Sequence, residues 1–205
     1  MSPEAIVYIV DDDEGSRYLL KCVLESVGLE SRAFASAKEF LDAYIHGVPA
    51  CLLLDVRMPI VSGLELQEDL KSRYDDLPVI IVTGHSDTQV AVRAMKAGAF
   101  DFIEKPIKDQ IVLETVAKAL EKSRDSLAHH KRISAVRTRL ESLTPREHEV
   151  LDQIKSGNLN KQIAYHLGIS ERTVEVHRGR VMKKMNARSL PDLITMVIGN
   201  QLSTG

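Results

Sequence analysis

The stretch CLLLDVRMPI, residues 51–60, decides the fold of the first half of the chain. Four apolar or weakly polar residues lead to Asp55, and Pro59 follows two residues past Arg57 as a breaker. An apolar run of this length that ends at a breaker is typical of a strand buried on both faces, as in a parallel sheet covered by helices. Such a strand needs no charge at its end, so the carboxylate of Asp55 requires a functional explanation.

The rest of the front half alternates between strand-like and helix-like segments. Apolar runs predict further strands at residues 5–10, 30–34, 77–83 and 99–103. Helical spacing predicts helices at residues 15–27, 36–46, 63–73 and 87–97, and a fifth helical pattern follows Lys108. Five strands that alternate with five helices predict an α/β fold with a doubly wound parallel sheet.

Charge is distributed unevenly along the 205 residues. Residues 1–110 carry 11 Lys+Arg against 19 Asp+Glu, a net charge of −8, whereas residues 111–205 carry a net charge of +6. This asymmetry indicates two domains with different partners, and it makes the basic half a candidate for nucleic-acid binding.

Composition indicates a cytoplasmic protein. Hydrophobic residues make up 44% of the chain and charged residues 27%, as in ordinary globular proteins. We expect no membrane span, because no apolar run approaches about 18 residues, and no signal peptide. Cys22 and Cys51 have no zinc-like spacing, so we expect two free, buried thiols in a reducing compartment.

The predicted sheet gathers chemically active side chains at one edge. Asp11–Asp13 follow the first strand, Asp55 ends the third, Thr83 ends the fourth, and Lys105 follows the fifth. The carboxyl ends of parallel strands meet at the edge where ligands bind. Close carboxylates repel one another, so they need a cation or must take up protons, and an all-oxygen set favours Mg²⁺. Asp55 can then attack a phosphorus centre, while Lys105 and Thr83 bind the phosphoryl oxygens.

These residues resemble the receiver domain of two-component response regulators. The resemblance rests on VDDD after the first strand, DVRMP around Asp55, VTGH at the fourth strand and FIEKP at the fifth, and it covers about residues 4–122. It implies a flavodoxin-like fold with strand order 2-1-3-4-5 and a sensor histidine kinase as phosphoryl donor. A cis peptide bond between Lys105 and Pro106 is also implied.

The same resemblance implies individual roles. Asp55 is implied as the phosphoacceptor, with Asp12, Asp55 and the backbone carbonyl of Arg57 as direct Mg²⁺ ligands and Asp11 as a ligand largely through water. Thr83 and Phe102 are implied as the switch residues. From the residues themselves, Phe102 is equally compatible with an ordinary core position. Asp13 is better explained as part of a solvated turn, and His85 as a flexible loop side chain.

A long helical segment follows the fifth strand, with no Gly or Pro between Gln110 and Leu140. A dimerising seam and a solvated linker helix are equally compatible with its pattern. The apolar register then slips to a second seam at Ile133, Val136, Leu140 and Leu143. A stammer or a break near His129-His130 would explain the slip. The first seam has a heptad-like spacing at Leu113, Val116, Leu120 and Leu127, with Ser123 at one intended seam position.

The back half has the pattern of four short helices. Thr144, Pro145 and Glu147 form a capping box at the start of the first. Gly157 and Gly168 end the first two helices. The predicted caps of the last three are Asn160, Ser170 and Ser189. A short helix, a tight turn and a basic helix form the helix-turn-helix layout.

The helix predicted from residue 171 has two different faces. A helical projection places Val174, His177, Val181 and Met185 on the packing side. The other side carries three cations that can neutralise phosphates and a valine that can contact a thymine methyl group. The residues of this second face are Arg172, Val176, Gly179, Arg180 and Lys183.

The back half resembles the DNA-binding domain of LuxR-type regulators. The resemblance rests on LTPRE, NKQIA and RTVEVHRGRVMKKM, and it covers about residues 139–200. It implies that DNA is contacted by Lys161, Thr173, Glu175, Val176 and Arg180. Gly179 departs from the pattern, because a side chain is usual at this position. A glycine in the middle of a helix lowers the stability of the helix by about 1 kcal/mol relative to alanine.

Together, the two resemblances identify the chain as a member of the NarL/FixJ family. They predict a receiver at residues 1–122, a helical linker at 123–140 and a helix-turn-helix domain at 141–205. The expected function is transcription control, in which phosphorylation promotes a homodimer that binds promoter DNA. An alternative function as a phosphatase would require a second carboxylate at position 57 as general acid, but this position is Arg57. A DNA-binding protein switched by a small ligand would require an apolar, aromatic-rich pocket in the front half, whereas aromatic residues make up 4% of the chain.

Overall fold

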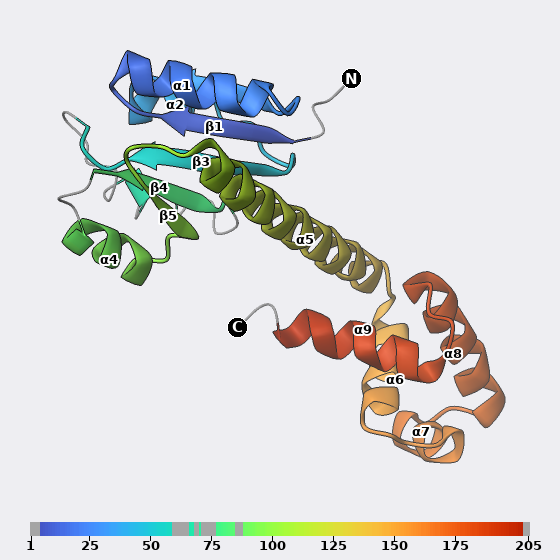
Figure 1. Ribbon diagram of the computed structural model, residues 1–205. Helices are drawn as coiled ribbons and strands as arrows, with labels where there is room; N and C mark the ends of the chain where they lie inside the picture. The colour runs from blue at the N-terminus through green and yellow to red at the C-terminus, as the bar shows by residue number, and fades with distance from the viewer. Residues whose placement is uncertain (1–4, 59–65, 68–69, 71–76, 85–87, 203–205) are drawn as a thin grey trace. The chain divides into compact units, whose positions relative to one another are not determined.

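The computed structural model describes residues 5–58, 66–67, 70, 77–84 and 88–202 (Figure 1). Contacts divide the chain into two compact units, Met1–Ala128 and His129–Gly205, each with its own hydrophobic core. Among the described residues, no helix is both long and apolar enough to cross a membrane.

The first unit is built on a five-stranded parallel sheet. The strand order is β2-β1-β3-β4-β5, which confirms the expected topology. The strands are β1 (Ile6–Val10), β2 (Glu30–Phe34), β3 (Ala50–Asp55), β4 (Val79–Thr83) and β5 (Asp101–Glu104). The helices are α1 (Glu14–Glu25), α2 (Ala37–Ala43), α4 (Thr88–Lys96) and the first part of α5 (Asp109–Glu141), which continues into the second unit.

Helices cover both faces of this sheet. On one face, Leu24 of α1 and Val116 of α5 pack in one cluster with Leu53 of β3. On the other face, Phe40 of α2 and Ala94 of α4 pack with alternate residues of the same strands. β1, β3 and β4 are buried along their whole length. The near-continuous apolar character of these strands therefore follows from burial on both faces.

Most predicted elements of the first unit agree with the structure to within a few residues. Ser36 caps α2 through its hydroxyl, which accepts a hydrogen bond from the Glu39 N–H. The helix predicted at residues 63–73 lies largely outside the described residues, as does His85; Leu66, Gln67 and Leu70 are helical and buried. Cys51 is buried but Cys22 is exposed, so the prediction of two buried thiols is wrong for Cys22.

Helix α5 corrects the interpretation of the linker. It is helical through His129 and His130, so the break that was one of the two explanations for the slip is absent. Val116 and Leu120 of the predicted dimerising seam are buried in the core of the first unit. Ser123 is buried at a seam position, where its hydroxyl accepts a hydrogen bond from the N–H of Ala50 at 3.0 Å. The first seam therefore packs against the sheet.

The slip in the apolar pattern has a simple cause. Val136 and Leu140, which belong to the second seam, pack against the core of the second unit. One continuous helix thus presents one apolar stripe to each unit in turn. The stripes differ in register because they face different partners, and the helix itself needs no interruption.

The second unit contains α6 (Pro145–Lys155), α7 (Asn160–Leu167), α8 (Glu171–Met185) and α9 (Leu190–Leu202). The capping box of Thr144 and Glu147 is present at α6, and Ser170 caps α8. Gly168, with φ +65°, ends α7 in the left-handed conformation that the tight turn requires. The prediction that Asn160 caps α7 is wrong, because the N-cap is Leu159.

Glu147, which is buried, forms an ion pair with half-buried Lys184 within this unit. Its Oε2 accepts a hydrogen bond from Lys184 Nζ at 2.6 Å and another from the Thr144 N–H at 2.8 Å. These hydrogen bonds, that of Lys184 above all, lower the pKa of Glu147 from 4.5 to about 2. The ion pair joins the start of α6 to the end of α8 and so fixes the position of the helix-turn-helix on its support.

We expect Lys184→Met to destabilise the second unit by about 1–2 kcal/mol, because it leaves the Glu147 carboxylate without its cation. The folded-state pKa of Glu147 is lowered, so its stabilisation is present above pH 4.5 and is lost as the pH falls toward about 2. Melting curves across this range should show a smaller acid sensitivity for the variant than for the wild type. Lys155→Met, which removes only the exposed pair with Asp152, is the control and should match the wild type.

Candidate phosphoryl-acceptor site and DNA-binding face

Three strand ends bring a lysine and two carboxylates into direct contact. Lys105, which follows β5, places Nζ 2.8 Å from Asp55 Oδ1 and 3.0 Å from Asp11 Oδ2. Asp55 and Asp11 are buried, and the other carboxylate oxygen of Asp55 accepts a hydrogen bond from the Arg57 N–H at 2.7 Å. The Lys105–Pro106 peptide bond is cis, as the resemblance implies.

The surroundings of Asp55 affect its protonation. Burial raises its pKa, and the nearby Asp11 carboxylate raises it further, against the hydrogen bond from Lys105. Burial alone would lower the pKa of Lys105, but its hydrogen bonds to Asp55 and Asp11 raise it overall. Lys105 therefore remains an ammonium ion that neutralises part of the negative charge around Asp55.

The acidic loop after β1 has two kinds of carboxylate. Asp13 is the N-cap of α1, and its Oδ1 accepts a hydrogen bond from the Ser16 N–H at 2.6 Å, which lowers the pKa of Asp13. This assigns Asp13 to the turn, as expected. Asp12 is exposed, and its carboxylate is directed to the same place as those of Asp11 and Asp55, since one oxygen from each lies within 4.8 Å of the others.

These three carboxylates are a suitable donor set for a hard divalent cation. Their oxygens lie close enough together to bind one ion, and Mg²⁺ prefers carboxylate oxygens and retained waters. They line a cavity of about 230 Å³ together with Arg57, Thr83 and Lys105. The predicted site residues at the strand ends are thus brought together at one cavity.

Arg17 is a contributor that the sequence interpretation missed. Its guanidinium Nη1 donates hydrogen bonds to the backbone oxygens of Asp11 at 2.7 Å and Asp12 at 2.9 Å. Arg17 thereby holds the loop that carries both carboxylates. The signal was a basic residue in the first turn of the helix after an acidic loop, but spacing alone does not distinguish this role from an ordinary surface arginine.

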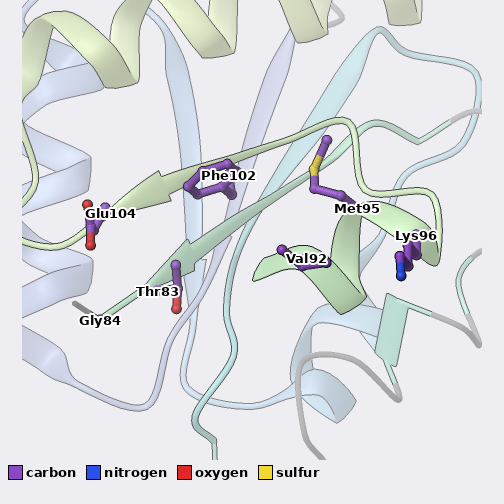
Figure 2. Close-up of a pocket in the computed structure, with 7 residues that line it drawn as sticks. All are labelled: Thr83, Gly84, Val92, Met95, Lys96, Phe102 and Glu104. Atoms are coloured by element: carbon purple, nitrogen blue, oxygen red, sulfur yellow. The ribbon is translucent and has the colours of Figure 1, made fainter. Parts of the chain in front are cut away.

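A second, larger cavity adjoins the site (Figure 2). It has a volume of about 500 Å³, and Thr83 lines both cavities. The Thr83 hydroxyl is buried and has no hydrogen-bond partner within the described part of the chain. Phe102 is 45% exposed at the edge of the larger cavity, so the core alternative for this residue is wrong. Val92 and Met95 of α4 form the opposite wall.

Helix α8 has the two faces that the projection predicted. Val174, Val181 and Met185 are fully buried, and His177 is half-buried. All five residues of the other face are exposed, and 47% of the surface of Val176 is accessible to solvent. Among the remaining expected DNA contacts, Lys161 and Glu175 are exposed, while Thr173 is half-buried beside the Ser170 cap.

Asn160 and Arg178 hold the two helices of the motif together. Arg178 Nη1 donates a hydrogen bond to Asn160 Oδ1 at 3.0 Å. Asn160 is at the start of α7 and Arg178 is on α8, so this contact fixes the angle between the helices. The sequence pattern predicts Asn160 only as a cap and gives no role to Arg178, because helix pairing across 18 residues leaves no local pattern.

Comparisons with known proteins agree with both halves of this structure. Residues 7–117 match the response regulator receiver domain, and residues 141–197 match the bacterial regulatory proteins of the luxR family. The chain is 46% identical over 197 residues to transcriptional regulatory protein FixJ of Azorhizobium caulinodans. This match covers 96% of the chain and 93% of that protein. It is 45% identical over 195 residues to nodulation protein W of Bradyrhizobium diazoefficiens, covering 95% of this chain and 86% of that protein.

Solved structures show the same similarity over nearly the full length. The response regulator StyR matches with a TM-score of 0.86 at 40% identity, covering 95% of this chain and 98% of that one. Full-length FixJ from B. japonicum matches with a TM-score of 0.59 at 36% identity, and the match covers 98% of this chain and 99% of that one. With a receiver at one end and a LuxR-type domain at the other, the chain belongs to the NarL/FixJ family of response regulators, which regulate transcription.

Proposed function

We propose that the chain accepts a phosphoryl group on Asp55 from a sensor histidine kinase and then controls transcription as a DNA-bound homodimer. The observation that carries the proposal is the contact of Lys105 with both Asp55 and Asp11 beside the exposed carboxylate of Asp12. In this assignment residues 1–122 receive the signal, residues 123–140 link the domains and residues 141–205 bind promoter DNA, all in the cytoplasm. The chain is a regulator and not a turnover enzyme.

The chemistry follows from how Asp55 is held. One of its oxygens is fixed by Lys105 and the other by the Arg57 N–H, so the carboxylate is oriented before a donor arrives. A carboxylate oxygen attacks the phosphorus of a kinase phosphohistidine, the P–O bond to Asp55 forms, and the P–N bond breaks. The departing imidazole takes a proton from solvent. Lys105 and the Thr83 hydroxyl then bind oxygens of the new acyl phosphate.

A bound Mg²⁺ would neutralise charge on the transferring phosphoryl group. The residues that would hold it are Asp11, Asp12, Asp55 and the backbone carbonyl of Arg57. Asp12 is the member of the set that makes no ion pair with Lys105 in the structure. Its carboxylate is therefore available to a cation without displacing an existing partner among the described residues.

We expect Asp12→Ala to weaken Mg²⁺ binding more than any other single change in the acidic loop, by about 10–100-fold. Calorimetric titration of the full chain with MgCl₂ measures this affinity. Asp13→Asn is the matched control, because asparagine is as good an N-cap as aspartate and Asp13 is assigned to the turn. Equal affinities for Asp12→Ala and the wild type would refute the assignment.

For the second domain we propose that the exposed face of α8 reads DNA in the major groove. Its cations can neutralise phosphates, and Val176 offers an apolar contact that a merely solvated basic face does not explain. Arg178 and the buried residues of α8 hold this face in position and are not expected to contact DNA.

We expect Arg180→Ala and Lys183→Ala to weaken binding to every DNA sequence and to reduce the salt slope by about one unit each. Val176→Ser should instead relax the preference at one base position, because it removes a methyl contact and no charge. Binding to specific and scrambled duplexes at several salt concentrations separates the two effects. Unaltered slopes together with an unaltered base preference would mean that another face meets DNA.

A further inference from the structure

Gly179 lies in the interior of α8, where a glycine weakens a helix, and the structure gives no internal reason for it. Its φ is not positive, unlike that of Gly157 at +77° and Gly168 at +65°, so any L residue can adopt its conformation. A Cβ built on Gly179 meets no heavy atom within 4 Å in the described part of the chain. Neither backbone geometry nor packing therefore requires a glycine at this position.

The position of Gly179 on the helix indicates what does require it. Gly179 is exposed between Val176, three residues before it, and Lys183, four residues after it. Residues at these spacings are neighbours on a helix surface. The missing side chain thus leaves a notch floored by the helix backbone, with an apolar wall on one side and a cation on the other. This notch lies in the middle of the face that we propose to meet DNA.

We infer that Gly179 is a specificity-determining residue, at which a base edge of duplex DNA approaches the backbone of α8 more closely than a side chain would allow. The inference rests on the proposed role of α8 and deepens it. Glycine is the residue used where a backbone must approach a ligand closely. The thymine C5-methyl group is the major-groove feature recognised by apolar contact, so the notch beside Val176 fits a base pair that contains thymine.

The test is Gly179→Ala in the full-length chain. The probes are a duplex selected from a random-sequence pool with the wild-type protein and a scrambled duplex of the same composition. The variant should melt about 4 °C higher or more, because alanine favours the helix. Its affinity for the selected duplex should fall by about tenfold or more, while its affinity for the scrambled duplex and its salt slope stay unchanged. A second selection with the variant should show altered preference at one or two adjacent positions.

Gly199→Ala on α9 is the matched control, because a Cβ there also meets nothing within 4 Å and the position is not on α8. It should not change the base preference. Wild-type preference in Gly179→Ala would overturn the inference, and so would an equal loss on both duplexes or a lower melting temperature. If Arg180→Ala still weakens binding in that case, the DNA-binding role of α8 stands and only the role of Gly179 fails. If neither variant changes binding, both fail.

Discussion

We expect Asp55→Asn to abolish phosphoryl uptake from acetyl phosphate, down to the level of a no-protein blank. Among the carboxylates at the carboxyl edge of the sheet, Asp55 alone ends the buried central strand β3 and contacts both Lys105 and the Arg57 N–H. An amide oxygen is a poor nucleophile, so the substitution removes the reacting group while keeping its shape. Acid-labile phosphate bound per chain, measured by phosphate-affinity electrophoresis and intact mass, gives the result directly.

The fold should survive this substitution. The amide oxygen that replaces the carboxylate can still accept the Arg57 N–H, and Lys105 keeps Asp11 as an ionic partner. The substitution also removes a carboxylate whose pKa is raised by burial, so we expect the melting temperature to change little or to rise. Asp42→Asn, at an exposed position on α2, is the matched control and should accept phosphate like the wild type. Stoichiometric acid-labile phosphate on Asp55→Asn would place the acceptor elsewhere.

The strands and the gathering of the site were predictable from the sequence for a physical reason. A parallel sheet buried on both faces requires continuous apolar runs, and AIVYIV and CLLLD show them directly. Once the strands are known, the topology itself brings Asp11, Asp55 and Lys105 to one edge. The contacts that orient these groups were not predictable. The Arg57 N–H is a backbone group, which has no side-chain signature, and the Arg17 guanidinium contacts backbone oxygens, a role that its spacing does not distinguish from that of a surface arginine.

For helix α5, the sequence predicted the buried stripe but not its packing partner. Its apolar spacing correctly indicated a buried stripe but not the surface against which the stripe is buried. A coiled-coil partner and the chain's own sheet present similar apolar surfaces, so Val116 and Leu120 fitted both interpretations. The polar Ser123 was the useful clue, because a buried hydroxyl needs a specific partner and here it meets the N–H of Ala50. A register change without Gly or Pro was better explained by a change of partner than by a break.

The surface beside the candidate site suggests a mechanism by which phosphorylation would change association. The Thr83 hydroxyl is buried without a partner among the described residues, and it lies between the site cavity and the larger cavity of about 500 Å³. A phosphoryl group on Asp55 is a strong acceptor that this hydroxyl can satisfy. We expect the Thr83 hydroxyl to move toward Asp55 and so to make room for Phe102, which is 45% exposed in the structure. The outer surface of α4 and β5 would then change shape.

We therefore expect the unphosphorylated chain to be mostly monomeric and the phosphorylated chain to dimerise through α4 and β5. Val92 and Met95 of α4 are exposed apolar side chains beside Phe102, and they are suited to a contact between two copies (Figure 2). Linking two DNA-binding domains on adjacent half-sites raises apparent affinity by about 10²–10⁴-fold through effective concentration. This gain requires no new contact to a base.

Sedimentation with and without acetyl phosphate, paired with DNA titrations, tests this mechanism. Met95→Asp should accept phosphate normally but remain monomeric and lose the gain in DNA affinity, because a charge on the apolar contact must be desolvated when two copies meet. Val27→Asp is the matched control, since Val27 is an exposed apolar residue outside α4 and β5. It should dimerise like the wild type. A rise in DNA affinity with no change in mass would instead favour release of a masked DNA-binding surface, for which the charges of −8 and +6 on the two halves provide an attraction.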